Sequence, residues 1–309
     1  MRKKVNITTS TFGTYSRKPI SLLDQKGLDI NYNKLFRKLT SNELIEQARG
    51  AAAVIAGTEL YSKEVLDELS DLKVISRLGV GTDNINLNVA KEKGIKIYTT
   101  QTSPAQAVVE LCLGLLLDLV RKITLQNNDV KNGIWEKSMG NLLYGKTLGI
   151  IGLGSIGKTL VKLVKGFNFN IMAFDIYEDN TFAQKHGLTY CDLDSLIKQS
   201  DIISIHLNLT VETNNLINSK RISLLKPESI LINTSRGEII DEDALYKALK
   251  NKQILGAGLD VFKEEPYSGS LVELENVILT PHIGSYAKEI RIKMETEAAE
   301  NLLRGINEK

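Results

Sequence analysis

The chain has 309 residues, which is enough for two domains that each bury a hydrophobic core. It is 42% hydrophobic and 25% charged, as in ordinary globular proteins, and its formal net charge is only +2. Lys and Arg are scattered among Asp and Glu, so nucleic acid is not an expected partner. The most apolar run, residues 108–120, contains Glu110 and Asp118 and is too short to span a bilayer.

The cysteines and the N-terminus bear on the compartment. Cys112 and Cys191 are the only two cysteines, and this small number fits a reduced compartment. No apolar segment follows the charged residues at the N-terminus, so we find no secretory signal. We therefore expect a soluble, cytoplasmic protein that binds neither membranes nor nucleic acid.

The first hundred residues alternate between strand and helix patterns. Strands are predicted at residues 5–8, 28–31, 52–56, 74–76 and 95–98. Helices are predicted at residues 20–26, 41–48, 62–69 and 86–93. This alternation indicates a parallel sheet with helices on its faces. No phosphate-binding glycine motif occurs in this part.

A long helix and a second α/β series follow. Ser103 and Pro104 are typical of a helix start, and this helix is predicted to run to about residue 123, long enough to bridge two domains. Six further strands are expected at residues 148–151, 171–174, 201–205, 230–232, 256–259 and 277–279. Strands separated by helices in this way are typical of a doubly wound dinucleotide-binding domain. Apolar residues every fourth position predict a last amphipathic helix at 288–304.

A glycine motif joins the first of these six strands to a helix. Gly152 allows a tight turn after the strand, Gly154 lets backbone N–H groups approach a pyrophosphate, and Gly157 allows close packing of helix and strand. The start of the helix adds N–H donors and partial positive charge for the phosphates. An ordinary strand–helix turn is the alternative, but the strand before and the helix after favour a dinucleotide site.

The next strand ends on a carboxylate. Asp175 lies 18 residues after Gly157, close to the roughly 20 typical of an acidic residue that binds the ribose hydroxyls of NAD. Ile176 and Tyr177 follow, so no arginine stands there to neutralise a 2′-phosphate. NAD is therefore favoured over NADP.

Three chemically useful side chains follow the last three strands. Arg236, Glu265 and His282 each come shortly after a strand end, on the edge that also carries the glycine motif. A guanidinium can bind a carboxylate with two hydrogen bonds and polarise a neighbouring carbonyl. A histidine can exchange the hydroxyl proton, and a carboxylate beside it would stabilise the imidazolium.

Each of these residues also has an ordinary structural interpretation. Arg236 could form a surface salt bridge, Glu265 could be a solvated loop residue, and His282 could be a structural histidine. Two other histidines compete: His186 stands at a helix end, where it caps carbonyls, and His206 ends a strand, where it is a candidate cofactor contact. The joint placement of all three residues favours a catalytic role, and we expect no metal site.

Five motifs carry a family resemblance over nearly the whole chain. The sequence resembles the D-isomer-specific 2-hydroxyacid dehydrogenases, most closely their phosphoglycerate dehydrogenase-like branch. The motifs are Ser76-Arg-Leu-Gly-Val-Gly-Thr-Asp-Asn84, Gly145-Lys-Thr-Leu-Gly-Ile-Ile-Gly-Leu-Gly-Ser-Ile-Gly157, Ile232-Asn-Thr-Ser-Arg-Gly237, Gly258-Leu-Asp-Val-Phe-Lys-Glu-Glu-Pro266 and Leu279-Thr-Pro-His-Ile-Gly284.

The resemblance implies roles for the residues in these motifs. Arg236 would bind the carboxylate of the 2-keto acid, Glu265 would tune the histidine, and His282 would be the acid/base. Substrate contacts would also come from Gly57, Val80 and Gly81. The residues implied to contact NAD are Val80, Gly152, Gly154, Ser155, Ile156, Gly157, Asp175, His206, Leu207, Thr234, Ser235 and Asp260.

The resemblance also implies a domain organisation. A doubly wound Rossmann cofactor domain, residues 101–284, would be inserted into a smaller flavodoxin-like α/β substrate domain. The substrate domain would comprise residues 1–100 and a C-terminal helix within 285–309. A homodimer would form largely through the cofactor domains.

The sequence departs from the family pattern at three places, which concern the segment between the domains, a cofactor contact and the choice of substrate. The segment from Gln101 to Glu110 lacks the usual Pro-Gly-x-Asn, and His206-Leu-Asn-Leu209 replaces the usual His-Leu-Pro-Leu. Phosphoglycerate enzymes typically carry an arginine in the loop after the third N-terminal strand. Here that loop carries Glu59, where a phosphate would need positive charge.

The leading hypothesis is an NAD-dependent oxidoreductase that interconverts a D-2-hydroxy acid and its 2-keto acid. Its substrate could be 3-phosphoglycerate, glyoxylate, hydroxypyruvate or a longer keto acid. A non-catalytic NAD(H)-binding scaffold is a second hypothesis. A Rossmann-like methyltransferase is a third, although it has no use for Arg236, Glu265 and His282.

Overall fold

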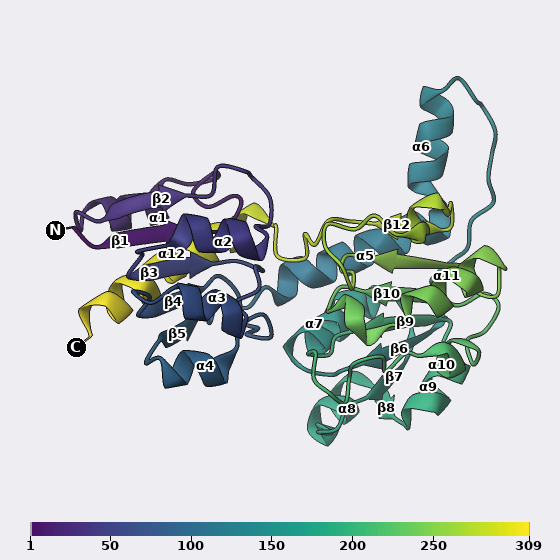
Figure 1. Ribbon diagram of the computed structural model, residues 1–309. Coiled ribbons are helices and arrows are strands. Elements are labelled where there is room, and N and C mark those ends of the chain that lie inside the picture. The colour runs from purple at the N-terminus through teal and green to yellow at the C-terminus, as the bar shows by residue number, and fades with distance from the viewer. Residues whose placement is uncertain (1, 309) are drawn as a thin grey trace. The chain divides into compact units, whose positions relative to one another are not determined.

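The computed structural model describes residues 2–308 and consists of two compact units (Figure 1). Unit 1 contains the chain up to Ser103 and again from Tyr286 onward, and unit 2 contains Pro104–Ser285. The second unit is thus inserted into the first. Within residues 2–308, no helix is both long and apolar enough to cross a membrane.

Unit 1 is built on five parallel strands in the order β2-β1-β3-β4-β5. The strands are β1 (Lys4–Ile7), β2 (Asp29–Tyr32), β3 (Ala53–Ala56), β4 (Val74–Arg77) and β5 (Lys96–Thr99). Its helices are α1 (Lys18–Asp24), α2 (Ser41–Ala48), α3 (Lys63–Glu68), α4 (Leu87–Glu92) and α12 (Lys288–Asn307). This strand order is that of flavodoxin-like sheets.

Side chains of the strands in unit 1 alternate between the two faces of the sheet, and each face has its own hydrophobic core. In β3, Ala53 and Ile55 face the core that α1 and α12 complete, whereas Val54 and Ala56 face the core under α2, α3 and α4. A strand covered on both faces has no polar side, which explains why all four residues of β3 are buried.

Unit 2 is built on seven parallel strands in the order β12-β11-β10-β9-β6-β7-β8. They are β6 (Thr147–Ile151), β7 (Asn170–Phe174), β8 (Leu188–Tyr190), β9 (Ile202–Ile205), β10 (Ile230–Asn233), β11 (Gly256–Leu259) and β12 (Val277–Leu279). Its helices are α5 (Ala105–Arg121), α6 (Ile123–Lys131), α7 (Ser155–Leu163), α8 (Asn180–His186), α9 (Leu193–Gln199), α10 (Ser219–Ile222) and α11 (Glu242–Lys250). Short 3-10 turns add η1 (Val164–Phe167), η2 (Gly237–Ile239) and η3 (Ser270–Glu273).

The order of these strands confirms the predicted doubly wound Rossmann-type fold. The chain starts in the middle of the sheet at β6, runs to one edge through β7 and β8, and then continues outward from β9 on the other side. Helices α5 and α7 pack on one face of the sheet, and α9 and α11 pack on the other. The reversal between β6 and β9 is the position where such sheets bind nucleotides.

Two elements of unit 2 differ from the predictions. Six strands were expected, but Leu188–Tyr190 adds β8 at the sheet edge, and its three residues are too few to show a period. The predicted helix to about residue 123 instead ends at Arg121, because Lys122 adopts a left-handed conformation with φ 52°. Helix α6 then continues in a new direction. It buries none of its side chains.

Gly149 in β6 shows how closely the helices pack on the sheet of unit 2. A Cβ at this position would lie 2.5 Å from Leu196 Cδ2 and would also collide with Ser200 Oγ, both on the α9 side. We expect Gly149→Ala to destabilise the protein by about 1–3 kcal/mol, since the crowded atoms must move apart. Gly114→Ala is the matched control, because Gly114 lies within α5 and a Cβ there meets nothing within 4 Å.

In a helix interior, alanine is better than glycine by about 0.5–1 kcal/mol, so this control should be slightly more stable than wild type. Urea unfolding followed by circular dichroism measures both changes. Equal midpoints for Gly149→Ala and wild type would show that α9 does not approach β6 so closely.

Candidate active site

Three neighbouring parallel strands place the predicted catalytic residues at one edge of the sheet. β10 pairs with β11, and β11 pairs with β12, so their carboxyl ends lie side by side. Arg236 follows β10, Glu265 follows β11 and His282 follows β12. The loops after β10 and β11 also touch, since a Cβ on Gly237 would collide with the backbone of Phe262 and Lys263. Residues far apart in sequence are thereby brought to the same edge.

His282 and Glu265 form a direct contact. The imidazole Nδ1 lies 3.0 Å from Glu265 Oε2 and 3.1 Å from Oε1. A carboxylate accepts hydrogen bonds, so Nδ1 carries a proton toward Glu265 and the other ring nitrogen, Nε2, points away from this contact. The Glu265 side chain is 17% exposed and that of His282 is 33% exposed, which leaves the imidazole accessible to a small molecule.

The backbone of His282 is held in an unusual conformation. Its φ of 55° is in the left-handed region, which costs a non-glycine residue about 1 kcal/mol. Its N–H donates to Asp260 O at 2.9 Å and to Thr280 O at 3.0 Å. The fold therefore dictates where the imidazole points.

Asp260 is fully buried and holds the turn that carries His282. Its Oδ1 accepts from Thr280 Oγ1 at 2.6 Å and from the Ile283 amide at 2.8 Å, and its Oδ2 accepts from the Gly284 amide at 2.8 Å. Burial raises the pKa of this carboxyl, and the hydrogen bonds oppose that rise. Family resemblance assigned Asp260 to the cofactor, and in the structure its carboxylate serves the 280–284 turn.

Asn233 organises the turn that carries Arg236. Its Oδ1 accepts from the Ser235 amide at 3.0 Å and from Ser235 Oγ at 2.8 Å, and its Nδ2 donates to Arg236 O at 2.8 Å. The Arg236 guanidinium donates to Ser235 O at 2.7 Å. We did not predict a role for Asn233 from the sequence, although an Asn at the end of a strand is typical of a turn.

The glycine motif has the geometry that a dinucleotide needs. Gly152 has a φ of 95°, and a Cβ there would lie 2.7 Å from His206 O. A Cβ on Gly157 would collide with Gly152 O, so α7 packs directly against the turn. A Cβ on Gly154 would meet nothing within 4 Å, and Gly154 and Ser155 are exposed at the start of α7. Open space thus lies before the start of α7, where a pyrophosphate fits.

Asp175 connects the end of β7 to the glycine motif. Its Oδ2 accepts from the Leu153 amide at 2.6 Å, and its Oδ1 accepts from the Tyr177 amide at 2.9 Å. Each carboxylate oxygen has a second lone pair that could accept from a ribose hydroxyl. The carboxylate follows β7, the strand next to β6 and its glycine motif, where the adenine ribose is expected. The residues present therefore fit NAD.

The remaining predicted cofactor residues of unit 2 border this region. His206 Nε2 lies 2.9 Å from Ser204 Oγ, and its Nδ1 is buried without a partner among residues 2–308. Burial lowers the pKa of His206 to about 4, so it is neutral near pH 7 and cannot replace His282 as a proton carrier. Thr234 Oγ1 lies 3.1 Å from Cys112 Sγ. Leu207 is partly buried and packs against the sheet core, and Ile156 is partly buried in α7.

The predicted substrate residues of unit 1 lie at the carboxyl ends of its own strands. Gly57 follows β3, and Val80 and Gly81 follow β4. Val80 is 57% exposed, and a hydrophobic side chain so exposed in a loop is available for contact. These residues belong to unit 1, whereas Arg236 belongs to unit 2.

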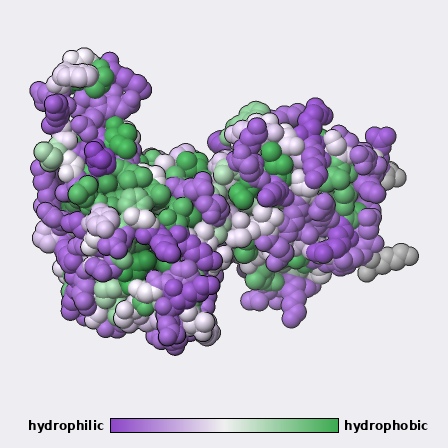
Figure 2. All heavy atoms as spheres, turned by 180° about the vertical axis from the view of Figure 1, so that it is seen from behind, coloured by the Kyte–Doolittle hydropathy of each residue, from purple (hydrophilic) through white to green (hydrophobic). Residues whose placement is uncertain are grey.

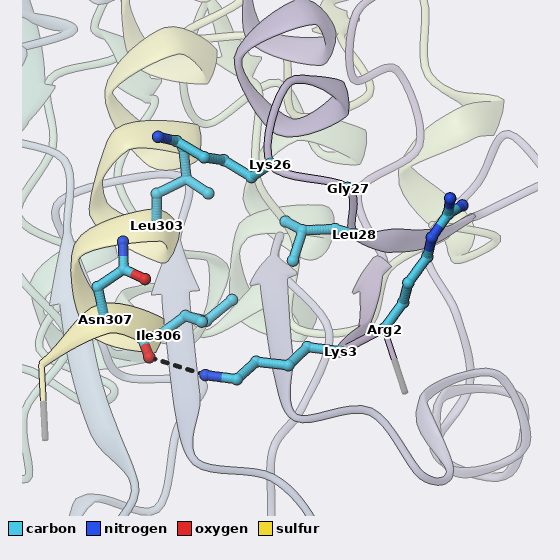
Figure 3. Close-up of a pocket in the computed structure, with 8 residues that line it drawn as sticks. All are labelled: Arg2, Lys3, Lys26, Gly27, Leu28, Leu303, Ile306 and Asn307. Atoms are coloured by element: carbon cyan, nitrogen blue, oxygen red, sulfur yellow. Dashed lines mark hydrogen bonds between the residues drawn. The ribbon is translucent and has the colours of Figure 1, made fainter.

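A cavity of about 620 Å³ lies elsewhere on unit 1 and contains none of the predicted site residues (Figure 3). Lys3 Nζ donates to Ile306 O at 3.0 Å there, so this lysine caps the end of α12. Lys26 and Gly27 follow α1, whose last carbonyls also need positive partners. Lys3 thus serves a helix end. Among residues 2–308, no three His, Cys, Asp or Glu side chains are grouped to bind a metal.

Comparison with known proteins agrees with this geometry. Residues 113–284 match the model of the D-isomer specific 2-hydroxyacid dehydrogenase NAD-binding domain. A glyoxylate reductase of Thermococcus litoralis is 41% identical over 84% of this chain and 82% of its own length. A D-3-phosphoglycerate dehydrogenase of Methanocaldococcus jannaschii is 40% identical over 85% of this chain, but the match spans 51% of that longer protein.

A solved structure agrees as well. The TT0316 protein of Thermus thermophilus is 32% identical, with a TM-score of 0.87 over 98% of this chain and 96% of its own. The matched segment of the family model includes the glycine motif, Arg236, Glu265 and His282. The chain therefore belongs to the D-isomer specific 2-hydroxyacid dehydrogenases, and its cofactor is NAD.

Proposed function

We propose that this protein interconverts a small 2-keto acid and its D-2-hydroxy acid, with Arg236, Glu265 and His282 as the catalytic residues. The observation that carries the proposal is the contact between His282 Nδ1 and Glu265 Oε2 at 3.0 Å. Glu265 lies in the loop after β11, and Arg236 lies in the loop after the neighbouring strand β10. Glyoxylate, hydroxypyruvate and the keto acid of 3-phosphoglycerate are the candidate substrates. The free cysteines Cys112 and Cys191 fit the reducing cytoplasm, where we propose that the protein acts.

Arg236 binds the substrate carboxylate in this proposal. Its guanidinium offers five donors in a planar fork, and this geometry matches the two oxygens of a carboxylate. Positive charge beside the substrate also polarises the adjacent keto group toward nucleophilic attack. Gly57, Val80 and Gly81 contact the rest of the substrate.

His282 donates the proton that the reduced oxygen needs. Because Nδ1 is hydrogen-bonded to Glu265, the protonated imidazole presents its Nε2–H to the substrate oxygen. Glu265 stabilises the imidazolium before transfer and holds the ring in place afterwards. NADH, when bound, supplies the hydride that no side chain can provide. In the opposite direction, neutral His282 accepts the hydroxyl proton.

Replacing the proton donor should abolish most turnover and leave cofactor binding intact. We expect His282→Ala to lower kcat for NADH-dependent reduction of 2-keto acids by a factor on the order of 10² to 10⁴. Glu265→Gln should cost less, because the imidazole stays but loses its negative neighbour. Steady-state kinetics on a panel of 2-keto acids measures both changes, and NADH fluorescence titration monitors cofactor binding.

The same panel separates the enzyme from a scaffold. Wild-type protein that binds NADH and reduces none of the keto acids would be an NAD(H)-binding scaffold. Full activity in His282→Ala would instead contradict the assignment of the proton donor.

The carboxylate of Asp175 is proposed to select NADH over NADPH, because it would repel a 2′-phosphate and accept from ribose hydroxyls. We expect Asp175→Ala to lower kcat/KM for NADH by a factor on the order of 10 to 100, the loss of a charged hydrogen bond. Activity with NADPH should not fall in parallel, so the NADPH/NADH ratio should rise. An equal loss with both cofactors would mean that Asp175 acts only by holding the Leu153 amide.

We also propose that two copies associate through an arm of unit 2, defined as residues 123–144. Helix α6 projects from the unit in Figure 1, and Figure 2 shows hydrophobic surface near the projecting segment. Trp135 and Met139 are 83% and 87% exposed. The other large apolar side chains exposed in the arm are Ile123, Val130, Ile134, Leu142 and Tyr144. Apolar surface on this scale is usually covered by a partner, and a second copy can cover it symmetrically.

Charges placed on the arm should prevent this association. We expect wild-type protein to sediment at twice the 34.3 kDa of one chain, and Met139→Glu with Leu142→Glu to sediment as a single chain. Val211→Glu is the control, since Val211 is 91% exposed outside the arm. Analytical ultracentrifugation measures all three. A double variant that remains dimeric would place the interface elsewhere.

A further inference from the structure

The two loops of unit 1 that carry the predicted substrate residues are joined to each other. One loop, residues 57–62, follows β3, and the other, residues 78–86, follows the neighbouring strand β4. Gly57 lies in the first loop, and Val80 and Gly81 lie in the second. Because β3 and β4 are parallel, both loops start at the same edge of the sheet. The position of one loop relative to the other therefore depends on the contacts between them.

Asn84, in the second loop, contacts the first loop with its side chain. Its Nδ2 donates to Gly57 O at 3.1 Å and to Glu59 O at 2.6 Å. The amide nitrogen carries two hydrogens, so the two carbonyls use both of them. Asn84 Oδ1 accepts from Arg77 Nε at 3.3 Å, and Arg77 is the last residue of β4. One side-chain amide thus connects the loop after β3 to the end of β4.

The backbone connects the same two loops. Asn84 O accepts from the Tyr61 amide at 2.8 Å, and Tyr61 O accepts from the Asn86 amide at 2.9 Å. Tyr61 and Ile85 thereby form an isolated parallel bridge. Tyr61 is fully buried, and its hydroxyl lies 3.2 Å from Thr8 Oγ1, directly after β1. The end of the first loop is therefore anchored by its backbone, whereas its start, at Gly57, is held by the side chain of Asn84.

Buried side chains also hold each loop separately. The Glu59 side chain turns inward, where its Oε2 accepts from the Gly57 amide at 2.7 Å, and Glu59 is only 2% exposed. A Cβ on Gly79 would lie 2.6 to 3.1 Å from three atoms of the Arg77 guanidinium, so the second loop passes directly over this side chain. Each loop thus has its own support, and Asn84 links the two supported loops.

We propose that Asn84 is a positioning residue for the 2-keto acid, because it sets the distance between Gly57 in one loop and Val80 and Gly81 in the other. The inference rests on the proposed function, in which these three residues contact the substrate. Asn84 itself touches no substrate. Its contribution is to substrate binding and not to the chemical step, since the proposed catalytic residues belong to unit 2.

The test replaces the donor of Asn84 without changing the size of the side chain. Asn84→Asp keeps an oxygen for Arg77 Nε but places a second oxygen opposite the carbonyls of Gly57 and Glu59. We expect KM to rise by a factor on the order of 10 for the 2-keto acid that the wild type reduces best, beginning with glyoxylate and hydroxypyruvate. We expect kcat to change by less than about threefold, because the lost interaction serves binding. Steady-state kinetics at saturating NADH measures both values.

Asn33→Asp is the matched control, because Asn33 makes the same kinds of contact in a loop without predicted substrate residues. Its Nδ2 donates to Thr8 O at 2.9 Å and to Arg37 O at 2.8 Å, and its Oδ1 accepts from the Leu35 amide at 2.9 Å. The control should lower the urea midpoint as Asn84→Asp does, but it should keep the wild-type KM. An equal rise of KM in both variants would mean that any loosening of unit 1 weakens substrate binding, and it would overturn the proposal.

Asn84→Ser and Asn33→Ser form a second pair that adds no charge, for use if the aspartate variants do not fold. A folded Asn84 variant with wild-type KM would overturn the inference and leave the proposed oxidoreductase intact. If both Asn84 variants fail to fold, the residue serves the stability of unit 1, and the positioning role is likewise overturned. A wild type that reduces no 2-keto acid would instead overturn the proposed function itself.

Discussion

The parallel pairing of β10, β11 and β12 is the constraint on which the candidate chemistry depends. Parallel strands end at the same edge, so three loops separated by crossovers of roughly 20 residues must meet there. Gly237 lets two of these loops touch, and buried Asp260 fixes the third. The contact between His282 and Glu265 follows from this arrangement, because the fold holds both loops at the same edge.

Much of this arrangement could be predicted from the sequence, because its signals are local. The glycine motif, Asp175 at the following strand end, and the placement of Arg236, Glu265 and His282 after successive strands all follow from short patterns. The start of α2 is equally local, since Thr40 and Glu43 form a capping box in the structure, although we did not predict it from the sequence. The β3 strand, buried on both faces, likewise reads as a continuous apolar run.

The features that escaped prediction depend on contacts between distant residues. A three-residue edge strand such as β8 has no period of its own, and the break at Lys122 depends on a single backbone conformation. Asp260 resembles any polar residue after a strand, and only the fold shows that it holds the turn of His282. The sequence likewise shows Glu59 as a charge in a loop, and only the structure shows it turned inward toward Gly57.

The insertion of unit 2 into unit 1 has a consequence for biosynthesis. Helix α12 supplies Met294, Ala298 and Leu302 to the core that it shares with β1 and β3. These residues leave the ribosome after all of unit 2, so unit 1 cannot complete its core while its N-terminal strands are already outside the exit tunnel. Unit 2 is contiguous and can fold earlier. Until α12 emerges, the face of the first sheet that α12 covers therefore remains partly exposed, and its apolar residues are available to a chaperone.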